Sequence, residues 1–452
     1  RTTSYQYDSL GRALRATQPE GNYTLYAYDA RGNVTSVTNV AKAGSGLANV
    51  VTTNTFPTTC TNIRTCNQPT STTDAAGQVT DYTYDATHGG VLTVTRPAPT
   101  SGAARPQARF TYTQVRAYYL NSYGQIVPGT PEYRLTATSS CSTGSSCAGT
   151  AAETRTAIVY GNGAQTTPYV GANLQPTSVT QSAGDNSVST QVSTSYDIYG
   201  NAIAVDGPLA GTADTTRYTY DADRELIGVE GSDPDGAGTG RLPQGLRTTY
   251  DNRGRVTLVE RGTLATSGVW SSFTSQQQQA VVYDSLDRTI QESLTSGGTT
   301  YALTQYSYDG AGRLDCVAVR MNPTVFASLG STSACTLGTT GTNGPDRITR
   351  NTYSNADELL TVTQGYGTAG ATTVATATFT SNGLQATLTD GRGNLTTYQY
   401  DGFDRLQKIR YPSLTTTGVS STTDFEQYAY DAASRLSSVT RRDGVSISYA
   451  YD

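Results

Sequence analysis

The strongest constraint on the fold is a short string that recurs along the whole chain. A tyrosine followed by an aspartate occurs eleven times, and the shortest interval, from Tyr7 to Tyr28, is 21 residues. A unit this short can only be a small supersecondary element that packs against its neighbours, so the sequence predicts a repeat protein. The pairs begin at Tyr7, Tyr28, Tyr84, Tyr196, Tyr220, Tyr250, Tyr283, Tyr308, Tyr400, Tyr430 and Tyr451.

The clearest copy, GNYTLYAYDARGNVTSVT at residues 21–38, indicates what one unit forms. Thr24, Tyr26 and Tyr28 fall on alternate positions, which is the periodicity of a β-strand. Asp29 and Gly32 follow as the first and fourth residues of a tight turn, so each unit is predicted to be a β-hairpin. The clearest turn residues are Tyr7, Asp8 and Gly11; Tyr28, Asp29 and Gly32; Tyr250, Asp251 and Gly254; and Tyr308, Asp309 and Gly312.

Some copies depart from this pattern. Arg224 replaces the turn glycine in YDADRE, and because arginine is poorly suited to a left-handed conformation, we expect a different turn there. In the outgoing strands apolar residues stand three apart, as Leu406 and Ile409 do. This spacing indicates either a β-bulge that shifts the register or a strand covered on both faces.

A single hairpin is marginally stable in water, so the units must associate. Tyrosines at a fixed register are expected to line up ring against ring across strands, each pair contributing roughly 0.2–1 kcal/mol. Only 36% of the residues are hydrophobic, which favours many small contacts over one large core. We therefore predict an all-β protein. Its repeated hairpins form a long antiparallel strip, and twist curls this strip into a spiral, a hollow shell or a barrel-like wall. One continuous repeat region is expected over residues 1–452, with an insertion-rich, divergent stretch at residues 97–195.

The strings YDSLGR, YDARGN, YDNRGR and YDGAGR resemble the YD repeats of the Rhs family. These repeats are shared with the C components of insecticidal toxin complexes and with the extracellular part of teneurins. The resemblance covers nearly the whole chain, which we interpret as a fragment of a longer protein. It implies a β-strip that spirals into a hollow shell. In bacterial members that shell encloses a variable C-terminal toxin, and in teneurins it serves as an adhesive ectodomain.

The cysteines indicate the compartment. The six residues fall into local pairs, for which we favour disulfides and keep free buried thiols as the alternative. A zinc site is not expected, because the spacings lack the C-x-x-C knuckles or histidines typical of such sites. Disulfides point to an oxidising, extracellular setting, so we predict a protein that is secreted or exposed at the cell surface. The expected pairs are Cys60 with Cys66, Cys141 with Cys147, and Cys316 with Cys335.

Candidate catalytic motifs each have a simpler interpretation. His88 is the only histidine and follows a Tyr-Asp turn, where a surface loop is expected. The string GYGTAG at residues 365–370 matches a dinucleotide fingerprint, but a Thr- and Val-rich segment follows it where that fold requires a helix. Asp233, Pro234, Asp235 and Gly236 read as a turn-forming loop, not as the self-cleavage segment of bacterial relatives. We therefore predict no enzyme, no cofactor and no metal site.

Charge and hydropathy limit the partners. The formal net charge is -5 without a basic stripe, so nucleic-acid binding is not expected, and no run of about 18 apolar residues suggests membrane insertion. Our leading hypothesis is a non-enzymatic structural wall that encloses a C-terminal toxin lying outside this fragment. Its partner would then be the rest of the same polypeptide. The alternative is an extracellular adhesin or filament segment that contacts cell-surface glycans, proteins or copies of itself.

Overall fold

The chain is described here by a computed structural model that covers residues 1–142, 144–161, 173–211, 213–233, 240–330 and 332–451. In these residues it is an all-β protein with 31 strands in one antiparallel sheet and three short 3-10 turns. The chain divides into two compact units. The first contains residues 1–89, 96–103 and 305–452, and the second contains residues 90–95 and 104–304.

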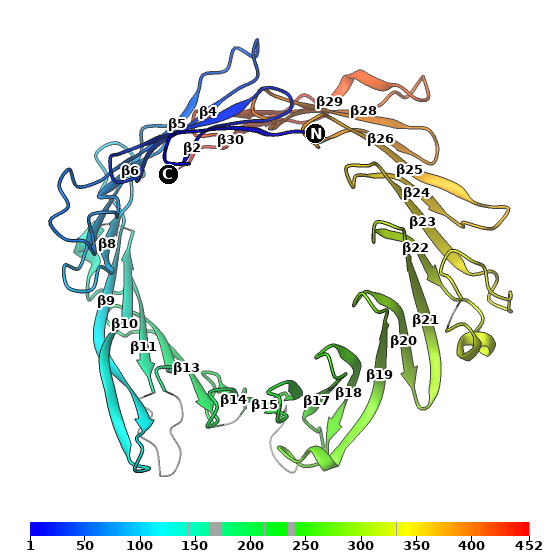
Figure 1. The fold of residues 1–452 in the computed structure, drawn as a ribbon, viewed down its shortest axis with the longest axis horizontal. Coiled ribbons are helices and arrows are strands. Elements are labelled where there is room, and N and C mark those ends of the chain that lie inside the picture. Colours follow the sequence, from blue (N-terminus) through cyan, green and yellow to red (C-terminus); the bar gives the residue numbers. More distant parts are fainter. Residues whose placement is uncertain (143, 162–172, 212, 234–239, 331, 452) are drawn as a thin grey trace. The chain divides into compact units, whose positions relative to one another are not determined.

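The first unit contains the strands from both ends of the chain (Figure 1). Its N-terminal strands are β1 (Ser4–Tyr7), β2 (Ala13–Thr17), β3 (Tyr23–Tyr28), β4 (Val34–Val40), β5 (Val50–Thr55), β6 (Ser71–Thr73) and β7 (Val79–Tyr84). Its C-terminal elements are β22 (Leu314–Val319), η3 (Pro323–Ser328), β23 (Arg347–Tyr353), β24 (Leu359–Gln364), β25 (Thr372–Phe379), β26 (Gln385–Asp390), β27 (Leu395–Tyr400), β28 (Leu406–Pro412), β29 (Ser420–Tyr430), β30 (Leu436–Thr440) and β31 (Ser446–Ser448).

The second unit contains residues 104–195 of the stretch predicted to be divergent, and includes the longest described strands, β9 and β10. Its elements, of which β21 ends in the first unit, are β8 (Val91–Thr95), β9 (Gln107–Leu120), β10 (Ile126–Cys141), η1 (Gly144–Cys147), β11 (Glu153–Tyr160), β12 (Pro176–Ala183), β13 (Ser189–Tyr196), β14 (Ala202–Asp206), β15 (Thr216–Tyr220), β16 (Leu226–Glu230), β17 (Gln244–Tyr250), β18 (Val256–Leu264), η2 (Trp270–Ser272), β19 (Phe273–Tyr283), β20 (Thr289–Ser296) and β21 (Thr299–Tyr308).

The described pairings join strands that are consecutive in the sequence, and a β-bulge recurs beside the turn tyrosine in many of the hairpins. In the hairpin of β27 and β28, Tyr400 pairs with Leu406 and Tyr398 pairs with Ile409, so one extra residue lies between the two apolar positions. Because paired residues share a face of the sheet, the bulge places Leu406 and Ile409 on the tyrosine side. The bulge therefore explains the three-residue spacing.

The left-handed turn conformation is kept in five turns where another residue replaces the glycine, namely Arg224, Asp287, Asp357, Asp404 and Ser434. Arg224 has a φ of +66°, as Gly254 has a φ of +75°, and its N–H donates to the carbonyl of Asp221 as in the other turns. The expectation of a different turn at Arg224 was therefore wrong. Its guanidinium lies 5.3 Å from the centre of the Tyr199 ring and donates to the Tyr199 carbonyl, contacts that offset part of the backbone strain.

Few side chains are fully buried in the described part of the chain, because the sheet is built of successive hairpins with no second layer of comparable size. The largest apolar ones are Leu264, Leu303 and Ile348. Ile348 belongs to a small cluster with Cys316, Ala318 and Ala334. Most strand residues are only half-buried, so the sheet depends on contacts between one hairpin and the next.

Candidate functional site

Each turn is stabilised first by its own aspartate. Asp8 Oδ1 accepts the backbone N–H groups of Leu10 and Arg12, both at 2.9 Å, and Gly11 follows in the left-handed conformation with a φ of +77°. The turns at Asp29, Asp251 and Asp309 repeat this geometry. In two turns that lack the Tyr-Asp pair, the side-chain oxygen of Asn121 or Ser354 accepts the equivalent backbone N–H groups. These carboxylates therefore accept hydrogen bonds from the backbone of the turn, as the sequence predicts.

The arginine that ends six of the Tyr-Asp turns is a functional residue that sequence reasoning missed. Arg255 Nη2 lies 2.6 Å from Asp251 Oδ2 of its own turn, and this hydrogen bond, with those from the backbone, lowers the pKa of Asp251 to about 2 despite partial desolvation. The same arginine–aspartate pair recurs in other turns. The pairs are Arg12 with Asp8, Arg288 with Asp284, Arg313 with Asp309, Arg405 with Asp401, and Arg435 with Asp431.

The guanidinium also reaches the next hairpin, where it covers the ring of the following repeat tyrosine. Arg12 lies 4.6 Å from the centre of the Tyr28 ring, and Arg255 lies 4.7 Å from that of Tyr283. Such a cation–π contact contributes about 0.5–1 kcal/mol at a partly exposed site. Arg313 over Tyr353, Arg405 over Tyr430 and Arg435 over Tyr451 repeat the arrangement.

The tyrosine hydroxyl completes the connection between hairpins. Tyr28 donates from Oη to the carbonyl of Ala13, the residue that follows Arg12 in the preceding hairpin, at 2.8 Å. Tyr250, Tyr283, Tyr353, Tyr430 and Tyr451 bond the equivalent carbonyls of Leu226, Val256, Leu314, Leu406 and Leu436. Each tyrosine is therefore held by a neighbouring hairpin, and in most of these copies by a neighbouring arginine as well.

At these copies a guanidinium takes the place of the stacked tyrosine ring that the sequence predicts. Two stacked pairs, Tyr5 with Tyr7 and Tyr82 with Tyr84, each lie within one strand. The cross-hairpin contact at Tyr28 is made by a guanidinium instead. The recurrence of an arginine five residues after the repeat tyrosine, as in YDSLGR, YDNRGR and YDGAGR, was the sequence signal that could have indicated it.

The left-handed turn position gives a direct test of the backbone argument. Gly77 has a φ of +79°, and an added Cβ would meet nothing within 4 Å, so Gly77→Ala should lower the free energy of unfolding by about 1–2 kcal/mol through backbone strain alone. The matched change Gly310→Ala, at a turn position without positive φ and equally open, should be neutral or slightly stabilising. Urea denaturation of both variants measures the difference, and equal effects would contradict the turn assignment.

A second polar cluster, which we call the seam, joins the first hairpins of the chain to hairpins near its end. Lys42 N–H donates to the Gly402 carbonyl at 2.8 Å, and Lys42 Nζ lies 2.5 Å from both Glu20 Oε2 and Asp404 Oδ1. Asn382 Nδ2 donates to Asp404 Oδ2 at 2.7 Å. All these residues belong to the first unit.

Close packing and charge both contribute to the seam. A Cβ at Gly402 would lie 2.6 Å from Ser45 Cβ and 2.9 Å from Ala41 Cβ, so this position requires glycine. Burial lowers the pKa of Lys42, but hydrogen bonds and charges from Asp404 and Glu20 outweigh it and leave the pKa raised. The lysine is therefore held as a cation between two carboxylates.

All six cysteines are joined in disulfides. Cys60 bonds Cys66, Cys141 bonds Cys147 and Cys316 bonds Cys335, with Cα–Cα distances of 4.9, 5.7 and 5.2 Å. These distances lie in the usual range for disulfides.

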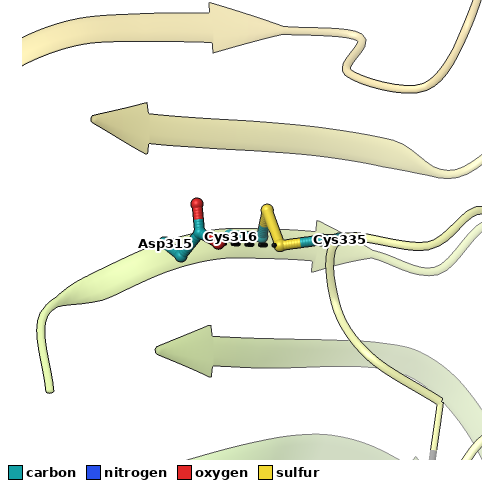
Figure 2. Close-up of side chains that lie close together, drawn as sticks. All are labelled: Asp315, Cys316 and Cys335. Carbon is teal, nitrogen blue, oxygen red and sulfur yellow. Dashed lines mark hydrogen bonds between the residues drawn. A yellow bond between two sulfur atoms is a disulfide. The ribbon is translucent and has the colours of Figure 1, made fainter. Parts of the chain in front are cut away.

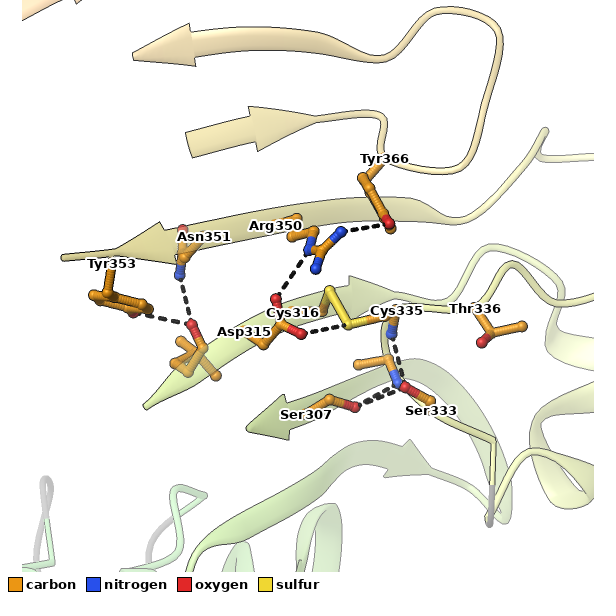
Figure 3. Close-up of a disulfide and its surroundings, with 12 residues drawn as sticks. Ser307, Asp315, Cys316, Ser333, Cys335, Thr336, Arg350, Asn351, Tyr353 and Tyr366 are labelled. Carbon is orange, nitrogen blue, oxygen red and sulfur yellow. Dashed lines mark hydrogen bonds and ion pairs between the residues drawn. A yellow bond between two sulfur atoms is a disulfide. The ribbon is translucent and has the colours of Figure 1, made fainter. Parts of the chain in front are cut away.

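The Cys316–Cys335 disulfide anchors the segment between β22 and β23 to the sheet (Figure 2). Asp315 is the nearest carboxylate, with Oδ2 3.4 Å from the Cys335 sulfur. In the described residues this trio is the one group whose side chains could together face a metal ion. The two sulfurs are already bonded to each other and offer no thiolate, so the trio is not arranged as a metal centre. Figure 3 shows Asp315 instead accepting from Arg350 Nε at 3.0 Å, while Arg350 donates to the Tyr366 hydroxyl.

The same segment contains a buried ion pair. Arg320 Nη1 lies 2.7 Å from Asp346 Oδ2, with exposed side-chain fractions of 0% and 3%. Arg320 also donates to the side-chain carbonyl of Gln305 and to the main-chain carbonyls of Thr336 and Ser333. Burial raises the pKa of Asp346, but the bonds from Arg320 and from backbone N–H groups outweigh it and leave the pKa lowered. The pair therefore fixes the segment internally.

The other sequence candidates lie in loops. His88 lies beside Asp85 in the turn after β7, and Asp85 Oδ1 accepts the backbone N–H of His88. The GYGTAG string forms the loop between β24 and β25, and a strand, not a helix, follows it at Thr372, as its Thr- and Val-rich sequence predicts. Pro234, Asp235 and Gly236 lie outside the described residues.

Comparisons with known proteins agree with the repeat. Residues 7–43 and 379–416 match the RHS Repeat family. No curated protein matches the chain. Among solved structures, the Tc holotoxin pore of Photorhabdus luminescens with the mutation TccC3-D651A is 13% identical, with a TM-score of 0.40 over 99% of this chain and 26% of that chain. TcdB2-TccC3 without its hypervariable C-terminal region is 14% identical, with a TM-score of 0.36 over 97% and 23%. The chain thus spans about a quarter of the length of these solved chains.

Proposed function

We propose that this chain, which carries RHS repeats, is a stretch of structural wall in a large secreted or cell-surface protein, and that the wall encloses another segment of the same polypeptide. The observation that carries the proposal is the seam. Hairpins at residues 20–42 and 382–404 are bonded to each other turn to turn, although about 360 residues separate them in the sequence. A sheet whose distant hairpins are joined in this way can bound an interior.

The chemistry of the repeat supports a structural role. The turn aspartates are engaged by backbone N–H groups and by arginine, and the repeat tyrosines by carbonyls of the neighbouring hairpin. Groups held in this way strengthen a wall and are not poised for proton transfer. Disulfides persist in oxidising compartments, which supports a location outside the cytosol.

Protease protection tests enclosure. The intact protein that contains this chain is treated with proteinase K, and the surviving peptides are identified by mass spectrometry. We expect a segment outside residues 1–452 to survive in the native protein and to be cleaved in Lys42→Glu, whose seam is broken. Lys408→Glu makes the same charge change away from the seam, where Lys408 lies over Phe425, and should retain protection. Digestion of everything outside the wall in the native protein would overturn enclosure and favour the adhesive or filamentous alternative.

A further inference from the structure

Several turns of the repeat end in a residue other than arginine, among them those that end in Asn33, Asn201, Glu225 and Glu358. In the turn that follows β15, the position that ends the turn is Glu225, so the carboxylate of Asp221 faces another carboxylate. Burial, followed by the charges of Asp221 and Asp223, raises the pKa of Glu225. Among the described residues no cation pairs with Glu225. The repeat tyrosine of the next hairpin, Tyr250, keeps its hydroxyl bond to Leu226 but has no turn guanidinium over its ring.

A cavity of about 350 Å³ lies at this position. Asp221, Glu225, Tyr250, Ile227 and Trp270 line it, and all of them belong to the second unit. Glu225 Oε1 extends toward Gly254 of the next turn, to within 3.1 Å of a Cβ built there, as Arg12 Nη1 extends toward Gly32 at 3.5 Å. The cavity therefore adjoins the position that the side chain of a turn arginine takes in other repeats.

Neighbouring arginines already have other partners. Arg247, which also lines the cavity, lies 2.6 Å from Glu260 and 4.8 Å from the centre of the Phe273 ring. Arg253 and Arg255 of the next turn both pair with Asp287. These side chains do not neutralise the two carboxylates of the turn.

The chain contains a precedent for how such a site is filled. Glu358 also ends a turn in place of arginine, and there an arginine from a distant segment, Arg1, pairs with it. Arg1 Nη2 donates to the carbonyl of Thr380, the first residue of the next turn, at 3.0 Å. Arg313 makes the equivalent bond from within the repeat, donating to the Ser354 carbonyl at 2.7 Å. Arg1 thus takes the place of the missing turn arginine.

We propose that the cavity at Glu225 binds an arginine side chain supplied by another polypeptide segment. Its guanidinium pairs with Glu225 and Asp221, lies over the Tyr250 ring, and donates to the Asp251 carbonyl, as the turn arginines and Arg1 do at the equivalent groups. This assignment rests on the internal comparison of turns and not on enclosure by the wall.

Trp270 allows a direct measurement, because it lines the cavity and is the only tryptophan in the chain. The folded chain is titrated with the blocked tripeptide Gly-Arg-Gly, and with its twin in which neutral citrulline replaces arginine, at constant ionic strength. We expect a saturable change in Trp270 fluorescence at millimolar concentrations with the arginine peptide only, since a single ion pair with a cation–π contact gives weak affinity.

The variant Glu225→Arg supplies the missing guanidinium from within the repeat. It should raise the thermal midpoint, because it restores the Asp–Arg–Tyr contact, and it should abolish the fluorescence response, so lost binding cannot be attributed to misfolding. Glu225→Gln should weaken the response. The proposal would be overturned if the wild-type chain gave no saturable response, or if it responded equally to the citrulline peptide, to a Gly-Lys-Gly peptide or to Ca²⁺ alone. An unchanged response in Glu225→Arg would also overturn it.

Discussion

Replacing Asp346 by alanine is expected to lower the free energy of unfolding by about 3–5 kcal/mol, because it leaves a fully buried guanidinium without its counter-charge. The change also removes the acceptor of two backbone N–H groups, those of Met321 and Gly338. Urea denaturation measures the loss. Hydrogen exchange over residues 320–346 shows whether the segment opens by itself before the sheet unfolds.

Two controls make this result specific. Asp424→Ala removes the partner of Arg442 in an exposed pair and should cost about 1 kcal/mol or less. Replacing Arg320 and Asp346 together by methionine and leucine should recover much of the loss, because no unpaired charge is then buried. A cost for Asp346→Ala no larger than that for Asp424→Ala would show that the pair does not hold the segment.

The second large effect is expected at the seam. Lys42→Glu puts a third carboxylate beside Glu20 and Asp404, and because the lysine is only partly buried we expect a loss of about 3 kcal/mol, below the upper range for buried pairs. The first hairpins should become sensitive to protease, since they lose their contact with residues 382–404. Lys408→Glu, which removes a cation from the Phe425 ring, should cost about 1 kcal/mol. Equal losses in the two variants would contradict the special role of Lys42.

The repeat hairpin could be predicted because its causes are local. The spacing of Tyr28, Asp29 and Gly32 determines a strand, a turn acceptor and a left-handed residue within a few positions of one another. The turn at Arg224 was mispredicted for a related reason. Conformational propensity measures the free-energy cost of placing an isolated residue in the left-handed region. In the folded chain, the hydrogen bonds of the surrounding hairpin and the contact with Tyr199 hold Arg224 there.

The contacts between hairpins were beyond local reasoning. The sequence showed that tyrosine and arginine recur, but not that the arginine of one hairpin covers the tyrosine of the next, because register and bulge decide which side chains meet. By itself, then, the sequence determined the hairpin, the spacing of its turns and the local pairs of cysteines. Only the tertiary structure decided that Lys42 meets Asp404, that Arg1 fills the place beside Glu358 and that the place beside Glu225 is a cavity. The physical reason is that these contacts depend on where distant hairpins lie, and no local spacing encodes that distance.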